Sequence, residues 1–205
     1  FRSTVLVSDL SVADGMPVVW LARLLGIPVR ERVAGSDMFE SLRRTSSSNP
    51  ISVFIFGGPE GVAARLCSQL NREKGGVRCA GWLFPGFGDL AAMSTDAIIS
   101  EVNASQAQFL AVALGAMKGQ AWLLRNQDRI TIPVRVHLGA SINFEAGTIR
   151  RAPTRWRKAG FEWLWRIMEE PHLWHRYFRD GLALAKILTF HAVPLRCLQI
   201  IDRLR

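Results

Sequence analysis

The chain has 205 residues, 49% of them hydrophobic, and a formal net charge of +9. This apolar content excludes an intrinsically disordered protein, and the length suffices for a domain with a real core. The charge favours an anionic partner: nucleic acid, a phosphate-bearing substrate or a membrane surface. From residue 148 onward 12 basic residues stand against 5 acidic ones, so the positive charge is concentrated near the C-terminus.

Three features bear on the compartment and on the extent of the chain. Cys67, Cys79 and Cys197 are widely spaced and show no metal or disulfide pattern, which favours a reducing compartment. No signal peptide is visible, and no apolar run is long enough to span a bilayer. The chain begins at Phe1 in what resembles the middle of a domain, so we expect its N-terminal part to be missing.

The predicted elements alternate along the first three quarters of the chain. Strand-like residues 10–12 come first, followed by helices over 17–26 and 35–44. Four short runs then predict strands, at residues 51–58, 77–84, 108–115 and 132–139, of which 51–58 and 108–115 are expected to be buried.

Helices are predicted between these strands. One covers residues 59–75, with Pro59 in its first turn and Gly75 at its end. The next covers 95–105 with Ser94 as its N-cap, and a third covers 118–129.

The repeated strand–glycine–helix pattern predicts an α/β fold with a mostly parallel sheet and helices on both faces. Ligands of such sheets bind at the carboxyl ends of the strands. From about residue 148 the strand signals stop and basic, Trp-rich helices follow. We therefore predict two domains, an α/β domain over residues 1–150 and a helical appendage over 151–205.

Two charged residues in the first 35 positions are candidates for chemistry. Asp14 follows the strand-like run and precedes a helix, where a carboxylate is well placed as a general base. On spacing alone, a turn or helix-capping aspartate is the favoured interpretation. Arg32 precedes a small-residue turn, and a surface arginine is the usual interpretation of one such residue.

Glycine turns after the predicted strands are candidates for phosphate binding. Gly57 and Gly58 lie in "FGGPEGVA", and Gly115 in "LGAMKGQAW", where a helix N-terminus can receive a phosphate. Neither stretch is a full dinucleotide fingerprint or a P-loop, so a tight turn is the alternative. Gly139 begins another small-residue loop, beside His137, which is more often structural than catalytic in this position.

The segment "FEWLWRIMEEPHLWHRYFRDG", residues 161–181, combines tryptophans with Arg166 and Arg176. Indoles beside arginines suit a membrane interface, where the cation meets lipid phosphate. The apolar run 182–195 that follows is too short to span a bilayer. A helical hairpin packed on the α/β domain is the alternative, and single-stranded nucleic acid is a weaker one.

Several motifs of metal and nucleotide chemistry are absent from the sequence. It contains no DxD pair, no Cys/His metal spacing, no GxSxG and no Walker lysine. We therefore expect no metal and no cofactor, with arginines and helix N-termini neutralising any bound phosphates.

The ordered motifs resemble the WecG/TagA/CpsF glycosyltransferase family over roughly residues 5–180. The motifs that carry the resemblance are "ADGMPVVW", "ERVAGSD", "FIFGGPEGVA", "PGFG", "EVNAS", "VALGAMKGQAW", "HLGASINFEAGTIRRAP" and "GFEWLWRIMEEPHLWHRY". The resemblance implies a Rossmann-like domain with a C-terminal helical appendage. It also implies sugar transfer from a UDP-sugar to a polyprenyl-diphosphate-linked saccharide, at the cytoplasmic membrane face. The "GAMKGQAW" and "RIMEEPHLWHRY" stretches lean toward the exopolysaccharide branch.

The resemblance also implies roles for individual residues. Asp14 matches the proposed base and Arg32 a pocket-lining arginine, while Arg166 and Arg176 match appendage arginines thought to reach the diphosphates. The chain departs from the family at three points. The family has an N-terminal strand and a polar ligand-binding turn before the region where this chain begins. The family glutamine falls on Gly119, with Gln120 one step away, and a further appendage arginine appears as Leu173.

The sequence thus predicts a peripheral membrane, metal-independent, inverting hexosyltransferase. A non-catalytic protein that binds nucleotide-sugars or membranes is the alternative, supported by the missing N-terminal part and the displaced glutamine. Nucleic acid is not an expected partner, since the interpretation as a nucleic-acid-binding protein rests only on the net charge and the Trp and Arg content. The apolar appendage is equally able to bury itself against a second copy of the chain, so a homo-oligomer stays open.

Overall fold

The computed structural model describes residues 2–204, which form two compact units. Unit 1 extends up to Ser11 and resumes over Gly35–Ile149, and unit 2 comprises Val12–Ala34 and the chain from Arg150. The predicted division at residue 150 places Val12–Ala34 in the first domain. In the structure this segment groups with the C-terminal helices instead, because its helix α2 (Met16–Leu24) packs against η3 (Leu188–Ala192).

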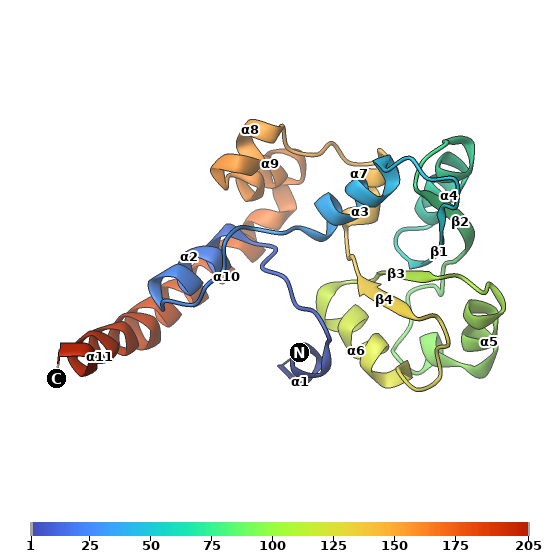
Figure 1. Cartoon of the computed structure of the whole chain (residues 1–205). Helices are drawn as coiled ribbons and strands as arrows, with labels where there is room; N and C mark the ends of the chain where they lie inside the picture. The colour runs from blue at the N-terminus through green and yellow to red at the C-terminus, as the bar shows by residue number, and fades with distance from the viewer. Residues whose placement is uncertain (1, 205) are drawn as a thin grey trace. The chain divides into compact units, whose positions relative to one another are not determined.

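Unit 1 is built on a four-stranded parallel sheet (Figure 1). Its strands are β1 (Ile51–Gly57), β2 (Val77–Leu83), β3 (Phe109–Ala113) and β4 (Val134–His137), in the order β2-β1-β3-β4. The connection from β1 runs to β2 on one side and that from β3 runs to β4 on the other, so the strand order reverses between β1 and β3. All four predicted strands and the parallel sheet are confirmed.

Helices cover both faces of this sheet, as the sequence predicts (Figure 1). One face carries α3 (Gly35–Arg44), α4 (Val62–Arg72) and α7 (Ser141–Glu145). The other carries η1 (Ala92–Ser94), α5 (Asp96–Ala104) and α6 (Ala116–Asn126), with α1 (Arg2–Val7) against α6. Burial from both sides explains why β1 and β3 are apolar along their length rather than alternating.

Trp122 of α6 is the largest fully buried side chain of unit 1. Its ring stacks on Phe56 of β1 with the centroids 4.2 Å apart. Its Nε1 donates a hydrogen bond to the carbonyl of Met93 at 2.7 Å, so the indole is buried with its polar atom satisfied. This contact anchors α6, the helix that follows β3, on the sheet.

Three local expectations differ from the structure. Residues 10–12 form no strand, because the chain passes from unit 1 to unit 2 there and lies outside the sheet. Helix α4 begins at Val62 rather than Pro59, since Gly61 turns the chain with a φ of +76°. The N-cap of α5 is Thr95, whose hydroxyl accepts from the Ile98 N–H, while the neighbouring Ser94 is buried.

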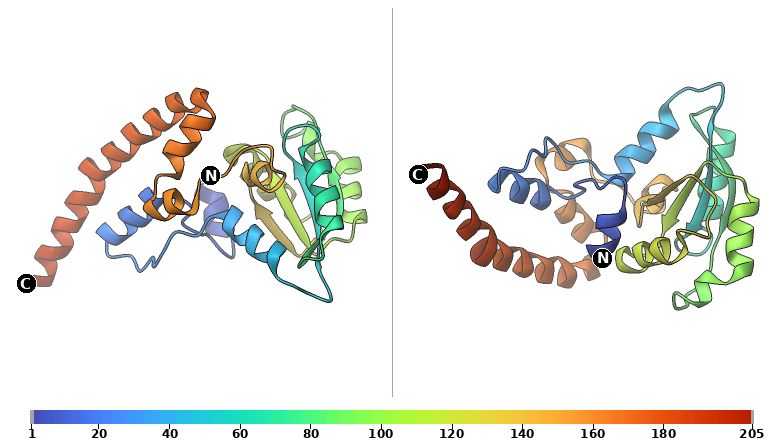
Figure 2. Two further views of the ribbon diagram at one scale, coloured as in Figure 1. Left: turned by 90° about the horizontal axis from the view of Figure 1, so that it is seen from above. Right: turned by 60° about the horizontal axis from the view of Figure 1, so that its bottom comes forward.

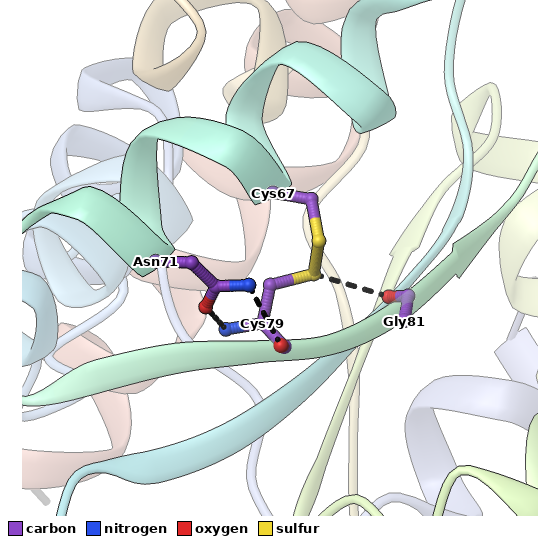
Figure 3. The surroundings of a disulfide bond; sticks show 4 residues. All are labelled: Cys67, Asn71, Cys79 and Gly81. Carbon is purple, nitrogen blue, oxygen red and sulfur yellow. Dashed lines mark hydrogen bonds between the residues drawn. A yellow bond between two sulfur atoms is a disulfide. The ribbon is translucent and has the colours of Figure 1, made fainter.

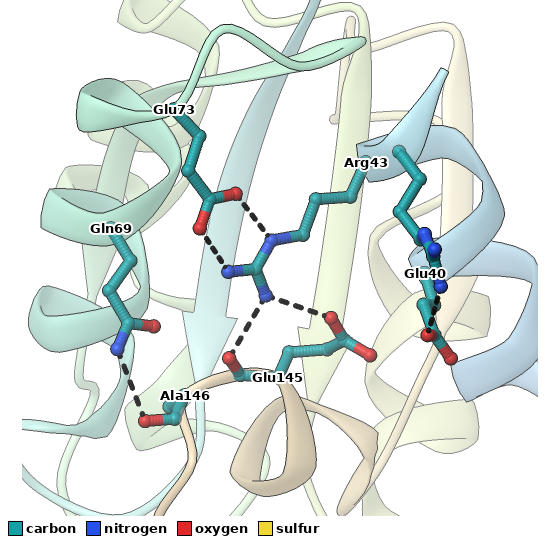
Figure 4. Close-up of polar contacts among 7 residues, drawn as sticks. Glu40, Arg43, Gln69, Glu73, Glu145 and Ala146 are labelled. Carbon is teal, nitrogen blue, oxygen red and sulfur yellow. Dashed lines mark hydrogen bonds and ion pairs between the residues drawn. The ribbon is translucent and has the colours of Figure 1, made fainter.

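Arg43 ties three elements of unit 1 together (Figure 4). Its guanidinium donates to both carboxylate oxygens of Glu73, at 2.7 and 2.6 Å, and to Oε2 of Glu145 at 3.0 Å. The hydrogen bond from Arg43 lowers the pKa of Glu73, and the same bond raises the pKa of Arg43. Glu73 lies at the C-terminal end of α4 and Glu145 lies in α7, so this arginine holds α3 beside these two helices.

A disulfide joins Cys67 of α4 to Cys79 of β2 (Figure 3). The side chain of Asn71 brackets Cys79, accepting from its N–H at 2.8 Å and donating to its carbonyl at 3.2 Å. The expectation that these cysteines show no disulfide pattern is therefore wrong. The packing of α4 on β2 brings the two Cα atoms to 5.1 Å, a proximity that sequence spacing does not reveal.

Unit 2 consists of helices, which confirms the helical appendage. It contains α2, α8 (Thr154–Ala159), α9 (Glu162–Glu169), η2 (Pro171–Leu173), α10 (Trp174–Ile187), η3 and α11 (Val193–Leu204). The last four form one long curved helix (Figure 2). Its π-helical turn η3 ends two residues before Pro194, which has no N–H for the carbonyl four residues earlier and whose ring would clash with it.

The helix over Pro171–Gln199 is long and apolar enough to cross a membrane, judged by length and composition alone. Only 6% of its most apolar 18-residue window, with a mean hydropathy of 1.3, is buried. The expectation that no such segment exists is therefore wrong. It considers only the apolar run 182–195, whereas the helix continues on both sides of that run.

The disulfide predicts a redox-dependent stability of the chain. It closes a loop with a sequence separation of 12 residues. By loop-closure entropy, reduction lowers the free energy of unfolding by ~3 kcal/mol. The measurement is chemical denaturation with and without a phosphine reductant, on protein whose intact mass shows two hydrogens fewer before reduction. Replacing the exposed Cys197 by alanine is the control and leaves both curves unchanged. Equal unfolding free energies with and without reductant contradict the pairing.

Candidate functional site

Five of the predicted site residues lie at the carboxyl edge of the sheet in unit 1. Gly57 ends β1 and Gly58 follows it, Gly115 and Gln120 come after β3, and Gly139 comes after β4. The reversal of strand order between β1 and β3 puts the first three at the switch point, where open α/β sheets bind ligands. The structure therefore brings this group of residues together at one edge.

Packing explains the glycines after β1. Gly57 and Gly58 have φ values of +90° and +87°, in the left-handed region that favours glycine. A Cβ at Gly57 would lie 2.7 Å from Leu114, and one at Gly58 would collide with Ile142. Gly115 differs, because a Cβ there meets nothing within 4 Å. Gly57 and Gly58 thus permit close packing at the edge, whereas Gly115 borders open space.

The N-terminus of α6 is the strongest candidate for an anion site in unit 1. Gly115 is its N-cap, and no side chain caps the helix. The first N–H groups of such a helix, together with its dipole, attract negative charge. Lys118 lies in the same first turn, and its Nζ donates to the carbonyl of Gly88 at 2.9 Å. A diphosphate at the switch point would meet both the backbone donors and this cation.

His137 is a structural residue, in line with its predicted interpretation. Its Nε2 forms a 2.9 Å hydrogen bond with the carbonyl of Leu114. A Cβ at Gly119 would lie 2.7 Å from the same Nε2, so the ring occupies the space beside this position. A side chain at 119 has no room, and Gln120 carries the amide instead. Within residues 2–204 its buried Oε1 has no hydrogen-bond partner.

Asp14 lies in unit 2, just before α2, and it is not a helix cap. The N-cap is Gly15, and no side chain makes a capping hydrogen bond there. The Asp14 side chain is 70% exposed. A backbone hydrogen bond of 3.0 Å from Val33 N–H to the Ala13 carbonyl holds its segment beside that of Arg32. This geometry disfavours the capping interpretation and leaves an accessible carboxylate.

Arg32 is not an ordinary surface arginine, since only 14% of its side chain is exposed. Its Nη1 donates to Glu162 Oε2 at 3.0 Å and to the Asp14 carbonyl at 3.4 Å, and lies 3.9 Å from Asp14 Oδ1. Sequence reasoning missed Glu162, which stands 130 positions away. The only signal was its place within the "GFEWLW" motif.

The two predicted appendage arginines lie on neighbouring helices of unit 2. Arg166 of α9 pairs with Glu170 at 3.0 Å, one turn further along the chain. Arg176 of α10 is exposed and lies over the Tyr177 ring, 5.0 Å from its centroid. Asp14, Arg32, Arg166 and Arg176 therefore all belong to unit 2.

Comparison with known proteins identifies the family. Residues 1–196 match the Glycosyl transferase WecG/TagA/CpsF family. The chain belongs to this family.

Two relatives of this family member carry the name N-acetylglucosaminyldiphosphoundecaprenol N-acetyl-beta-D-mannosaminyltransferase. The protein of Bacillus spizizenii (strain ATCC 23059 / NRRL B-14472 / W23) is 27% identical over 169 residues. That of Bacillus subtilis (strain 168) is 23% identical over 169 residues. Each match covers 82% of the chain and 64% of the relative. The chain therefore spans somewhat less than two thirds of the length of these WecG/TagA/CpsF relatives.

A metal centre has no obvious place in the described part of this family member. Among residues 2–204, no group of three or more His, Cys, Asp or Glu side chains is arranged to hold a metal ion. The cation beside Asp14 is the guanidinium group of Arg32, which supplies positive charge without coordination chemistry. Metal independence itself stays a prediction.

The contact between Gly119 and His137 predicts a stability difference between two alanine variants of α6. Gly119→Ala forces a Cβ against the imidazole and lowers the free energy of unfolding by about 1–3 kcal/mol. Gly115→Ala on the same helix meets no atom, so it changes stability by less than ~1 kcal/mol. Chemical denaturation of both variants checks this difference. Equal effects of the two substitutions contradict the packing of His137 on Gly119.

Proposed function

We propose that the chain transfers a sugar from a UDP-sugar to a polyprenyl-diphosphate-linked saccharide. Family membership and the names of the two relatives, which specify a lipid-linked diphosphate acceptor, support this function. The observation that carries it is the accessible Asp14 carboxylate beside the largely buried Arg32 guanidinium, 3.9 Å away. By resemblance the product belongs to bacterial surface polysaccharide biosynthesis, of the exopolysaccharide type.

In this proposal Asp14 is the general base. The acceptor hydroxyl oxygen attacks the anomeric carbon of the donor sugar while the bond from that carbon to the UDP oxygen breaks. The hydroxyl proton passes to the Asp14 carboxylate, and UDP leaves with the bonding electrons. A positioned carboxylate in this role contributes on the order of 10²–10⁴-fold to the rate. The 70% exposure of Asp14 is consistent with access by a substrate hydroxyl.

The diphosphate charges are neutralised by helix N-termini and arginines in this proposal. The uncapped N-terminus of α6, with Gly57, Gly58 and Gly139 along the same edge, is assigned to the donor. Arg32, Arg166 and Arg176 are assigned to the phosphate oxygens of donor or acceptor. Fixed cations of this kind stabilise the charge that develops on the leaving UDP. We propose that they do so without a metal ion.

The stereochemistry follows from a single displacement. One attack on the anomeric carbon inverts its configuration, so a donor with an α-linked sugar yields a β-glycoside. The names of both relatives specify transfer of a β-linked sugar, which fits this expectation. We therefore propose an inverting reaction for the chain.

We further propose that the enzyme works as a peripheral protein on the inner face of the cytoplasmic membrane. Large apolar side chains are exposed along the last long helix, and they include Leu182, Ile187, Phe190, Val193, Leu195 and Leu198. An exposed apolar surface of this extent favours transfer into an apolar phase. A lipid-linked acceptor lies in that phase, so docking there brings enzyme and acceptor together.

A non-catalytic binding protein is the second candidate. The glycine at position 119, where the family has a glutamine, is the observation in its favour, because the neighbouring His137 leaves no space for a longer side chain. Such a protein would bind a UDP-sugar without releasing UDP. The following measurement separates the two candidates.

Turnover is measured as UDP release from a panel of UDP-sugars, with a polyprenyl-diphosphate-linked sugar acceptor and EDTA present. Asp14→Asn removes the base and lowers kcat by at least ~100-fold. The control Asp9→Asn changes another exposed aspartate nearby in the sequence and leaves kcat unchanged. UDP release that depends on the acceptor and disappears only in Asp14→Asn supports the proposal. Unaltered release by Asp14→Asn contradicts the role of the base, and loss of release in EDTA contradicts metal independence.

Membrane association is measured by co-sedimentation with vesicles that contain anionic lipid. The double variant Leu182→Glu/Phe190→Glu places charge in the exposed apolar surface, where full burial of each side chain contributes about 1.5–3 kcal/mol. We expect a decrease in vesicle binding of at least ~10-fold. Phe87→Glu is the matched control, since Phe87 is 92% exposed and belongs to unit 1, and it leaves binding unchanged. Equal binding by the double variant and the control contradicts the proposal.

A further inference from the structure

Glu162 lies between two arginines that come from different segments of unit 2. It is in the first turn of α9, and its Oε2 accepts from Arg32 Nη1 at 3.0 Å. Its Oε1 lies 3.9 Å from Nε of Arg151, a residue of the segment before α8. The exposed fractions of the three side chains are 18% for Glu162 and 14% for each arginine. One carboxylate is thus shared by two largely buried guanidinium groups.

This arrangement connects Glu162 to the proposed base through a single residue. The same Nη1 atom of Arg32 that contacts Glu162 also lies 3.9 Å from Asp14 Oδ1. The four charged groups therefore form a continuous series in the order Asp14, Arg32, Glu162 and Arg151. A change at Glu162 reaches Asp14 through Arg32, although Glu162 does not contact Asp14 in this series.

Electrostatics indicate what the carboxylate does. Two guanidinium groups near one another repel, and low exposure weakens the screening by water. A carboxylate between them offsets this repulsion, through a charge-assisted hydrogen bond from Arg32 and an ion pair with Arg151 at 3.9 Å. Largely buried ion pairs contribute little net stability on average, because desolvation of the charges offsets their attraction. The arrangement is therefore better explained by the positions that it gives to the arginines than by a gain in stability.

We propose that Glu162 is a positioning residue that holds Arg32 and Arg151 as a two-guanidinium clamp for a substrate diphosphate. Arg151 thereby becomes a further diphosphate-binding residue. The catalytic part of this proposal rests on the proposed function. Guanidinium forks match phosphate oxygens in geometry, and a clamp fixed in advance needs no reorganisation when the ligand binds. The diphosphate is that of the UDP-sugar or that of the lipid-linked acceptor, which share this chemistry.

Direct binding tests the clamp independently of turnover. UDP and inorganic pyrophosphate are titrated into the full chain by calorimetry. Glu162→Gln and Arg151→Gln each weaken the binding of at least one probe by ~10-fold or more, in line with the loss of a charge-assisted contact. The matched control Glu73→Gln removes the ion pair of Arg43 in unit 1 and leaves both affinities unchanged. Absence of binding by the unmodified chain, or equal affinities of Glu162→Gln and the control, overturns the clamp.

Steady-state kinetics then test the positioning role. Glu162→Gln lowers kcat/KM by ~10-fold or more, and Glu162→Asp restores part of it because the carboxylate is kept. A rise of KM for the UDP-sugar assigns the clamp to the donor, and a rise of KM for the acceptor assigns it to the lipid-linked diphosphate. In an Arg32→Gln background Glu162→Gln has little further effect, because Glu162 acts through Arg32. Two results together overturn the positioning role. One is that the losses in kcat/KM of the two single variants multiply in the double variant, and the other is that Glu162→Gln lowers only the stability of the chain.

The two sets of measurements separate this inference from the proposed function. A chain that binds UDP or pyrophosphate through Glu162 and Arg151 but transfers no sugar contradicts the proposed function and keeps the clamp. A chain that transfers sugar with unchanged kinetics in both Glu162→Gln and Arg151→Gln keeps the proposed function and contradicts the clamp.

Discussion

The ion pair between Arg32 and Glu162 joins parts of the chain that are 130 positions apart, and unit 2 depends on it. Together with the packing of α2 against η3, this ion pair links Val12–Ala34 to the C-terminal helices. The segment that carries Asp14 is therefore part of the helical unit. The proposed base is therefore positioned by the helical unit.

Much of the sheet could be predicted from the sequence, because its signals are local. The four strands are short runs that end near glycines, and the burial of β1 and β3 from both sides requires the helices that separate the strands. Helix ends were less predictable, since Gly61 and Thr95 set them through backbone conformation and one hydrogen bond. The pairing of Cys67 with Cys79 and the place of Val12–Ala34 are properties of tertiary packing, so no local pattern encodes them.

The candidate site also has a part that local sequence signals predict and a part that only tertiary contacts reveal. The glycines after β1, β3 and β4 were predictable, because parallel strands end at one edge. Asp14 and Arg32 were identified through a family resemblance, and spacing alone favoured a helix cap and a surface arginine. The structure supplies what the resemblance lacks, namely the exposure of Asp14, the burial of Arg32 and the carboxylate that holds it. Glu162 and Arg151 lie within motifs of the resemblance, but their pairing becomes visible only through their contacts in the structure.

The central claim is that this member of the WecG/TagA/CpsF family extends a lipid-linked saccharide by one sugar. The most direct measurement is mass spectrometry of a polyprenyl-diphosphate-linked sugar after incubation with the chain and a panel of UDP-sugars. The account predicts an acceptor heavier by one sugar residue, formed in equal amount with free UDP. An acceptor of unchanged mass with every donor, from folded chain that binds UDP, would contradict the account and favour a binding protein.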